Sequence, residues 1–317
     1  MFKPPVNHEN DSHGEIKICF NSKKVYAGDK ILGQVFIKGF KDIANVMLNG
    51  CLVAEEWSWI AKANPQEKDH EQVIEIFPRI QKSYICGNTC PGGMEYRFDI
   101  DIVVPKEAPA AIRVDNEKAK GHIAYYYILD MTCNGCPELV KTAKVKVRER
   151  FEHKEKQTDE SSGTVQGYCY TNKGQLKLGC VVQSLGDLNK VDETIKGELK
   201  VDNRGCPYDI KVMRGKLSQK INLQSQGRTS MYFDTIISWD AGAVKGSEQK
   251  ALTMTQKMPY NEKYACMSST SKGRLITRSY CLDISPEYET FVCCAPSISI
   301  PFEIENLKTH KKKDHKK

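Results

Sequence analysis

No stretch of this sequence approaches the roughly 20 consecutive apolar residues that a helix needs to cross a bilayer. Residues 1–8 also lack the apolar core of a secretion signal. The sequence therefore predicts neither a membrane-spanning nor a secreted protein, and a cytoplasmic location is expected. Apolar patterns of helical period are missing as well, so no helix of about ten residues or more is expected.

Motifs for catalysis are also absent. The sequence has no Gly-x-Ser-x-Gly elbow, no glycine-rich phosphate loop before a helix and no His-x-x-x-His pair. Only 7 residues are histidine, and most of them lie in polar stretches. Because function must be argued from a site, these absences predict a protein that is not an enzyme, has no small-molecule substrate and requires no cofactor.

The composition is that of a folded protein with more than one domain. Hydrophobic residues make up 40% and charged residues 27% of the 317 residues, so extensive disorder is not expected. A chain of this length suits two domains of about 150 residues each. The formal net charge of +7 permits attraction to acidic membranes or acidic protein segments. Nucleic acid is not expected as a partner, because no aromatic residues interleave with the basic residues of the tail at 307–317.

One motif occurs in both halves of the chain. In residues 25–37, Asp29 precedes Ile31 by two positions, Gly33 follows two positions later, and apolar residues then alternate with others. Residues 191–201 repeat this order. Such alternation is typical of a half-buried strand, whose successive side chains point to opposite faces.

Two further landmarks recur in the same order. Residues 46–52 correspond to 211–217, and residues 121–130 correspond to 273–283. A fixed order of shared landmarks is the pattern of two similar units in tandem. The repeat therefore predicts that these motifs serve the architecture rather than a ligand.

The strand-like runs are separated by turn residues throughout, which is typical of antiparallel β-sandwiches. A polar stretch at 62–72 is predicted to be a loop, and 152–163 has no apolar residue and is predicted to be a linker. The predicted organisation is a polar leader (1–13), a first sandwich (14–151), a linker (152–163), a second sandwich (164–306) and a basic tail (307–317).

Several phrases in this order are similar to those of one family. They are Tyr26 to Val35; Leu48, Gly50 and Trp57; Tyr96, Phe98 and Pro105; Gly121, Ile123 and Tyr125; Cys169-Tyr170 before Gly174-Gln175-Leu176; and Ile300-Pro301-Phe302. Over roughly residues 14 to 306 the chain resembles the arrestin-domain-containing, or α-arrestin-like, proteins. The resemblance implies an all-β protein of two tandem arrestin-like, immunoglobulin-like antiparallel β-sandwich domains.

The same resemblance implies a non-enzymatic adaptor or scaffold in endocytic and endosomal protein transport. Its expected partners are cytoplasmic segments of membrane proteins or sorting machinery, with a peripheral location on the endosomal or plasma membrane. The sequence departs from the family in lacking a Pro-Pro-x-Tyr motif, since Pro4-Pro5 is followed by Val6-Asn7, and in having a short tail. These departures favour an alternative, a structural subunit of a larger cytoskeletal or ciliary assembly. A retromer subunit shares the fold, but the phrases suit α-arrestins better.

Cysteine spacing gives the sharpest local pattern. Two turns containing glycine and asparagine carry a cysteine at each end, namely Cys86 with Cys90 and Cys133 with Cys136. If the two turns meet at one end of the first sandwich, four thiolates can bind one structural zinc ion in tetrahedral geometry. The alternative is that these are ordinary thiols in ordinary turns. The other cysteines are expected to be reduced and mainly buried.

Two other features are candidates for binding partners. The tail carries six lysines, which would attract an acidic partner or an anionic lipid surface: Lys308, Lys311, Lys312, Lys313, Lys316 and Lys317. A solubilising, disordered end is the alternative interpretation. Trp57 and Trp59 share one face of a predicted strand and are candidates to anchor a protein partner, although such pairs usually pack on the sandwich itself.

Overall fold

The computed structural model describes residues 14–64, 66–85, 89–134, 138–151, 156–183, 194–258 and 270–303. Most of them lie in β-strands, and the helical element within these ranges is a single 3-10 turn, η1 (Tyr168–Tyr170). None of the described residues forms a helix long and apolar enough to span a membrane. The predicted all-β class with antiparallel sheets is confirmed.

The chain forms two compact units. The first contains Met1–Arg150 together with two later segments, Asn222–Ser230 and Ser271–Thr277. The second contains the remaining parts, which are Phe151–Ile221, Met231–Thr270 and Arg278–Lys317. The sequence predicted two uninterrupted domains, so the two later segments that join the first unit are a finding of the structure.

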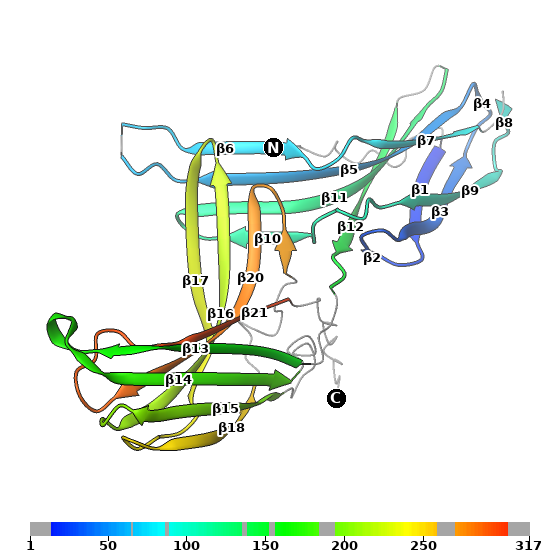
Figure 1. The fold of residues 1–317 in the computed structure, drawn as a ribbon. Coiled ribbons are helices and arrows are strands. Elements are labelled where there is room, and N and C mark those ends of the chain that lie inside the picture. The colour runs from blue at the N-terminus through cyan, green and yellow to red at the C-terminus, as the bar shows by residue number, and fades with distance from the viewer. Residues whose placement is uncertain are drawn as a thin grey trace, which may run out of the picture. The chain divides into compact units, whose positions relative to one another are not determined.

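The strands of residues 1–150 form two sheets and a small pair (Figure 1). They are β1 (Gly14–Phe20), β2 (Lys24–Tyr26), β3 (Lys30–Gly39), β4 (Ile43–Ala44), β5 (Met47–Ile60), β6 (His70–Glu75), β7 (Ile80–Ile85), β8 (Thr89–Cys90), β9 (Glu95–Val103), β10 (Ile112–Asp115), β11 (Ala119–Thr132) and β12 (Leu139–Arg148). One sheet has the order β1-β3-β9. The larger one has the order β2-β12-β11-β5-β6, with β10 beside β11 and β7 beside β5. Its β2–β12 pair is parallel, which the antiparallel prediction did not include.

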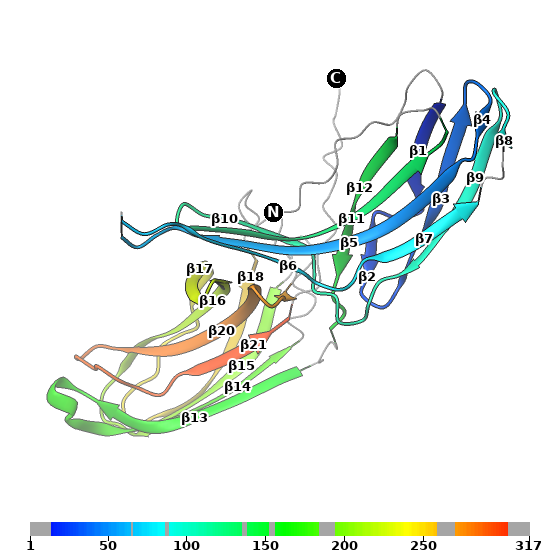
Figure 2. The ribbon, with the colours of Figure 1, turned by 90° about the horizontal axis from the view of Figure 1, so that it is seen from above.

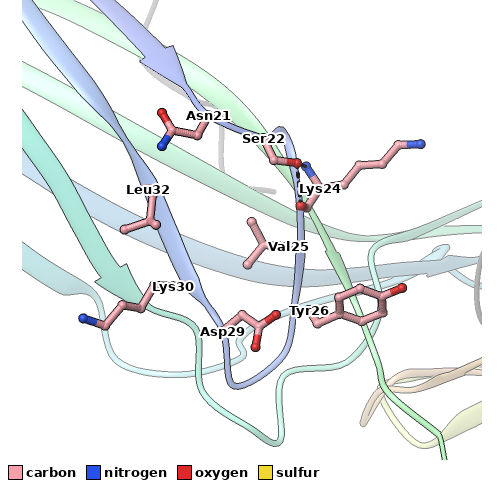
Figure 3. A pocket seen from close by; sticks show the side chains of 8 residues that line it. All are labelled: Asn21, Ser22, Lys24, Val25, Tyr26, Asp29, Lys30 and Leu32. Carbon is pink, nitrogen blue, oxygen red and sulfur yellow. Dashed lines mark hydrogen bonds between the residues drawn. The ribbon is translucent and has the colours of Figure 1, made fainter.

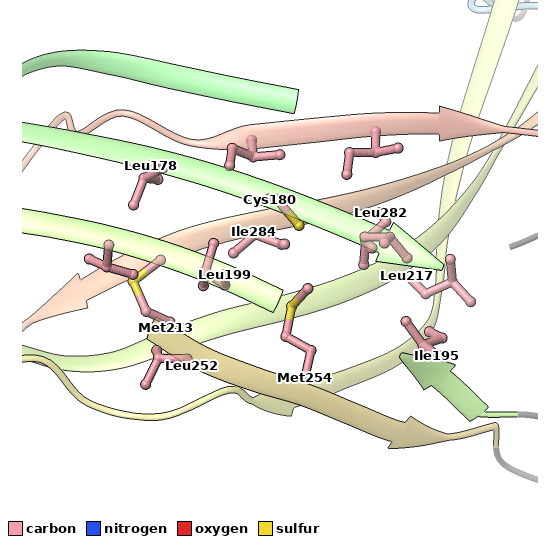
Figure 4. Close-up of a cluster of buried hydrophobic side chains, with 14 of the residues drawn as sticks. Leu178, Cys180, Ile195, Leu199, Met213, Leu217, Leu252, Met254, Leu282 and Ile284 are labelled. Carbon is pink, nitrogen blue, oxygen red and sulfur yellow. The ribbon is translucent and has the colours of Figure 1, made fainter. Parts of the chain in front are cut away.

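The later strands also form two sheets. They are β13 (Lys156–Gln166), β14 (Asn172–Gln183), β15 (Thr194–Gly205), β16 (Ile210–Ser225), β17 (Arg228–Asp240), β18 (Gln249–Lys257), β19 (Ser271–Lys272), β20 (Ile276–Tyr288) and β21 (Ile298–Phe302). Their orders are β13-β14-β15-β18 and β17-β16-β20-β19, with β21 beside β20. Buried side chains from both sheets, such as Leu178, Leu199, Met213 and Leu282, form one hydrophobic core (Figure 4).

Strands β5 and β11 are the longest in the first unit and pair along their whole lengths. One half of each faces the β1-β3-β9 sheet, where Leu48 and Tyr127 are buried. The other half extends past β1, β3 and β9 (Figure 1, Figure 2). This extended half carries Trp57 and Trp59.

The recurring glycines have matching structural roles in the two halves. Gly33 on β3 and Gly197 on β15 each lie against the backbone of the neighbouring strand, with no room for a Cβ atom. Gly50 makes room for the ring of Tyr127, and Gly215 does the same for Trp239. The repeated glycines therefore stand where a neighbouring strand or an aromatic ring comes too close for a larger residue.

Two predicted irregular segments contain strands. The predicted linker is wrong over its second part, because Lys156–Gln166 is strand β13. The predicted loop at 62–72 ends early, because β6 begins at His70. Strand β13 is an edge of its sheet and carries mainly polar side chains, so it lacks the apolar alternation that marks a strand in the sequence. The first residues of β6, His70 to Gln72, are polar and lack this alternation as well.

Candidate functional site

The tryptophan pair lies on one face of the extended half of the large sheet. Antiparallel partners that lie directly opposite each other share a face. The residues opposite the tryptophans on β11 and β6 therefore complete a surface that we name the tryptophan face: Trp57, Trp59, Lys120, His122, Glu71 and Val73. Both tryptophan rings are half-buried, and Val73 is 39% exposed.

Neighbours on the sheet contact both rings and hold that of Trp57 in position. The Nε1–H group of Trp57 donates to Oε1 of Glu71 over 2.7 Å. The His122 ring stacks at a tilt on Trp57, with 5.3 Å between the ring centroids. The ammonium of Lys120 lies 5.9 Å from the centroid of Trp59. Trp57 is therefore held by a hydrogen bond and a stacked ring, and charged side chains border both tryptophans. Protein interfaces have a similar aromatic centre with a polar rim.

A buried carboxylate on the same face of β5 holds His122 in place. Glu55 is 3% exposed, and its Oε1 lies 2.8 Å from Nε2 of His122. The hydrogen bond satisfies the carboxylate and holds the imidazole against Trp57. Glu55 therefore positions one wall of the tryptophan face.

The opposite face of β5 is covered by the two later segments of the first unit. Glu56 is 1% exposed and accepts hydrogen bonds from the backbone N–H groups of Arg274, Leu275 and Ile276 at 2.9, 2.8 and 2.5 Å. Burial raises the pKa of the Glu56 carboxyl, and the three N–H donors oppose that rise. We name this side, with Glu56 and Ser58, the closed face.

Further contacts join the closed face to the turn between β16 and β17. Ser58 donates its hydroxyl to the carbonyl of Gln224 over 2.5 Å. The Gln226 backbone N–H donates to the side chain of Gln72, and the Gln226 side chain donates to the carbonyl of Glu71. The same stretch of β6 therefore supports both the tryptophan face and this turn.

The two predicted cysteine turns lie close together as far as the structure describes them. Strand β8, with Cys90, pairs with β4, and the N–H of Asn134, next to Cys133, donates to the carbonyl of Ala44 on β4. Cys86 and Cys136 lie outside the described residues. Among the residues that are described, no three histidine, cysteine, aspartate or glutamate side chains form a group that could hold a metal ion. The four-cysteine zinc site thus remains a prediction.

The repeated motif itself lines a pocket (Figure 3). The pocket has a volume of about 150 Å³ and includes Tyr26, Asp29 and Lys30. Its charged groups are already paired, since Asp29 accepts from Arg150 at 2.8 Å and Lys30 donates to Asp101 at 3.0 Å. The volume is below the roughly 300 Å³ at which ligand pockets begin, so the pocket offers no ligand site.

Exposed thiols at one end of the second unit differ from the expectation of buried cysteines. Cys169, Cys293 and Cys294 are all exposed, whereas Cys180 and Cys206 are buried as expected. Cys293 and Cys294 precede β21 in an irregular segment. The adjacent Cys-Cys pair was the signal that could have found them.

The remaining predicted binding feature is the lysine tail, residues 307–317, which lies outside the described residues.

Comparison of the chain with models of known protein families and with curated proteins finds no match.

Proposed function

We propose that this protein is a non-enzymatic adaptor or scaffold that binds cytoplasmic segments of membrane proteins or sorting machinery in endocytic or endosomal transport. The observation that carries the proposal is the tryptophan face. One of its aromatic anchors, Trp57, is already held in position by Glu71 and His122, so binding a partner there costs little side-chain entropy. The arrestin-like resemblance of the sequence supplies the class of partner.

The geometry favours a protein partner over a small molecule. The tryptophan face lies on a sheet rather than in a concavity, and charged side chains such as Glu71 and Lys120 surround the apolar centre. Interfaces between proteins have this arrangement of an aromatic centre and a polar rim. Small-molecule sites instead enclose most of the ligand surface.

Affinity purification of the full chain tests the proposal when the wild type is compared with a Trp57→Ala/Trp59→Ala variant. We expect membrane-protein tails or sorting machinery with the wild type and their loss with the variant. Chemical crosslinks from the partner should fall on Lys120 and its neighbours. Recovery of the same partners by both forms would contradict the role of this face.

A structural subunit of a larger assembly is the second candidate, and one observation favours it. Edge strand β17 carries two widely exposed apolar side chains, Met231 at 47% and Phe233 at 66%. An exposed apolar edge of this kind is typical of a permanent contact, since edges accept further strands. Purification would then yield a fixed stoichiometric assembly, which Phe233→Ala should weaken while the tryptophan variant does not.

A structural zinc ion in the first unit is a separate proposal. Cys86, Cys90, Cys133 and Cys136 would supply four thiolates, and the position of Thr89 and Asn134 beside Ala44 supports their meeting. Metal analysis should find about one zinc per chain. Chelation should lower the unfolding temperature of the wild type but not of a Cys86→Ser/Cys133→Ser variant, and a zinc-free, fully folded preparation would contradict the site.

Peripheral membrane attachment through the lysine tail is also a proposal. Each basic residue near an anionic surface contributes about 1 kcal/mol, so six lysines give appreciable binding at low ionic strength. Vesicles containing phosphatidylserine should retain the full chain and release a variant that lacks residues 307–317. Equal binding by both forms would leave the tail as a solubilising end.

A further inference from the structure

Cys293 and Cys294 are adjacent in sequence, and both are exposed. The Cys293 thiol donates toward the carbonyl oxygens of Gln166 at 3.3 Å and Gly167 at 3.0 Å. The neighbouring Cys293 thiol raises the pKa of Cys294. Two thiols on consecutive residues thus lie at the surface of the second unit.

Backbone hydrogen bonds fix the segment that carries the pair. The Cys293 N–H donates to the carbonyl of Gln166 over 2.8 Å, and the Gln166 N–H donates to the carbonyl of Cys294 over 2.8 Å. The backbone on both sides of the Cys293–Cys294 peptide is therefore held in place, so a disulfide between the two thiols would strain that peptide.

Three exposed aromatic rings lie at this same end of the unit. Tyr168 is 75%, Tyr170 is 74% and Phe291 is 64% exposed, and the rings of Tyr168 and Phe291 are 6.3 Å apart. Cys169 and Tyr170 both adopt positive φ angles, of 54° and 58°, which is uncommon for residues other than glycine. The thiol pair therefore adjoins a strained aromatic turn through the carbonyls of Gln166 and Gly167.

We propose that Cys293 and Cys294 form a reversible redox modification site, a vicinal dithiol that is oxidised to a disulfide. This inference is independent of the proposed adaptor function. Its reduced form is the one in which Cys293 contacts the Gln166 and Gly167 carbonyls.

Glutathione disulfide is an oxidant of suitable class for this reaction. The Cys293 thiolate attacks one of its sulfur atoms, giving a mixed disulfide and one glutathione. The Cys294 thiolate then attacks the Cys293 sulfur and displaces the second glutathione. Two protein thiols are oxidised, one glutathione disulfide is reduced to two glutathione molecules, and both thiol protons pass to the departing glutathione thiolates.

Covalent geometry makes the product easy to reduce. Adjacent Cα atoms lie about 3.8 Å apart across a trans peptide, whereas most disulfides join Cα atoms about 4.4–6.8 Å apart. A strained disulfide is more oxidising than a relaxed one and is characteristic of regulatory pairs. Oxidation also removes the thiol hydrogen from Cys293, so its bonds to Gln166 and Gly167 are lost and the Tyr168 turn loses an anchor.

Phenylarsine oxide tests whether the two thiols act together, because a trivalent arsenical condenses with two neighbouring thiols and releases water. Mass spectrometry of peptides from the reduced full chain should find the arsenical on the Cys293–Cys294 peptide. The adduct should be lost in Cys293→Ser and in Cys294→Ser, and kept in the matched exposed-thiol control Cys169→Ser. An unmodified peptide in the wild type would overturn the proposal.

A glutathione titration tests the redox step itself. As the disulfide fraction of the buffer rises, the wild-type peptide should lose two hydrogen atoms and resist alkylation, whereas Cys294→Ser should stop at a stable glutathione adduct on Cys293. Hydrogen exchange of residues 166–171 should increase on oxidation in the wild type and not in Cys294→Ser. The proposal fails if the pair stays fully alkylatable in buffers that already modify Cys169.

Discussion

The two faces of strand β5 show how neighbouring residues in one strand come to serve different purposes. Glu55 and Glu56 are adjacent, and both carboxylates are buried. Glu55 is bound by His122, which belongs to the same sheet, whereas Glu56 is bound by backbone N–H groups of the segment 274–276. One face is therefore stabilised within its own sheet, and the other is completed by residues more than 200 positions later.

This difference indicates which face is available for binding. The polar groups of the closed face are bonded to distant parts of the chain, so a change there should cost stability. The tryptophan face keeps Trp57 and Trp59 half-exposed, so a change there should cost binding first. Substitutions on the two faces should therefore differ in whether they lower stability or binding.

Glu56→Ala should have the largest effect. The substitution leaves three backbone N–H groups buried without an acceptor, and we expect the free energy of unfolding to fall by about 3 kcal/mol or more. Urea unfolding measures the loss. Glu56→Gln is the matched control, because it keeps an oxygen acceptor and should lose less; an Ala variant as stable as the wild type would remove the distinction between the faces.

The pH dependence of Glu56 provides a second measurement on the same residue. Since burial raises the pKa of the folded state, this group's contribution to stability is complete below the ordinary glutamate pKa and is lost as pH rises through the raised value. The wild type should therefore lose stability relative to Glu56→Gln across that window. A constant difference between the two proteins at all pH values would show that Glu56 does not titrate there.

Trp57→Ala/Trp59→Ala should weaken partner binding by about 2 kcal/mol, or roughly 30-fold, because aromatic anchors dominate interface energies. Isothermal titration with the purified partner measures the change. Val73→Ala, on the same face, should have a smaller effect. If the tryptophan variant lost stability but bound the partner as tightly as the wild type, the assignment of the two faces would be contradicted.

Ser58→Ala should destabilise the protein by about 1 kcal/mol, since the Gln224 carbonyl loses a hydrogen bond within the closed face. Thermal or urea unfolding detects this loss, and binding to a partner should be unchanged. If the variant bound its partner more weakly but kept its stability, the assignment of Ser58 to the closed face would be contradicted.

Glu71→Ala should have the smallest effect on stability, within about 0.5 kcal/mol. It also removes one hydrogen bond, to Trp57, but the groups are near solvent and water replaces the lost partner. Comparing the stability of this variant with that of Ser58→Ala therefore compares the loss of one hydrogen bond on each face. If both variants lost the same free energy of unfolding, the tryptophan face would exclude water as well as the closed face does.

Strands whose apolar side chains alternate along the chain could be located closely from the sequence. Residues 15–20 and 96–104 alternate in this way and correspond to β1 and β9, each displaced by one residue at most. Strands without this alternation could not be predicted in the same way. Strand β13 is held by backbone hydrogen bonds to β14, and such bonds require no apolar side chain.

The candidate site was predictable only in part. Trp57 and Trp59 were placed on one strand face by their spacing, and the structure bears that placement out through the register of β5 with β11. The hydrogen bond from Trp57 to Glu71 depends on which strand lies beside β5, and no local pattern contains that information. The pair Cys293 and Cys294 lies in an irregular segment before β21 rather than in a strand, because which residues join a sheet depends on partner segments far away in the sequence.

The sequence by itself determined the period of the strands, the repeated glycine positions and the pairing of the two tryptophans on one face, because these depend on neighbours along the chain. Only the tertiary structure decided that Glu56 is enclosed by residues 274–276 and that Asn222–Ser230 joins the first unit. Those contacts join segments far apart in sequence, and the free energy of burying a carboxylate is repaid only when the donors from the distant segment are in place.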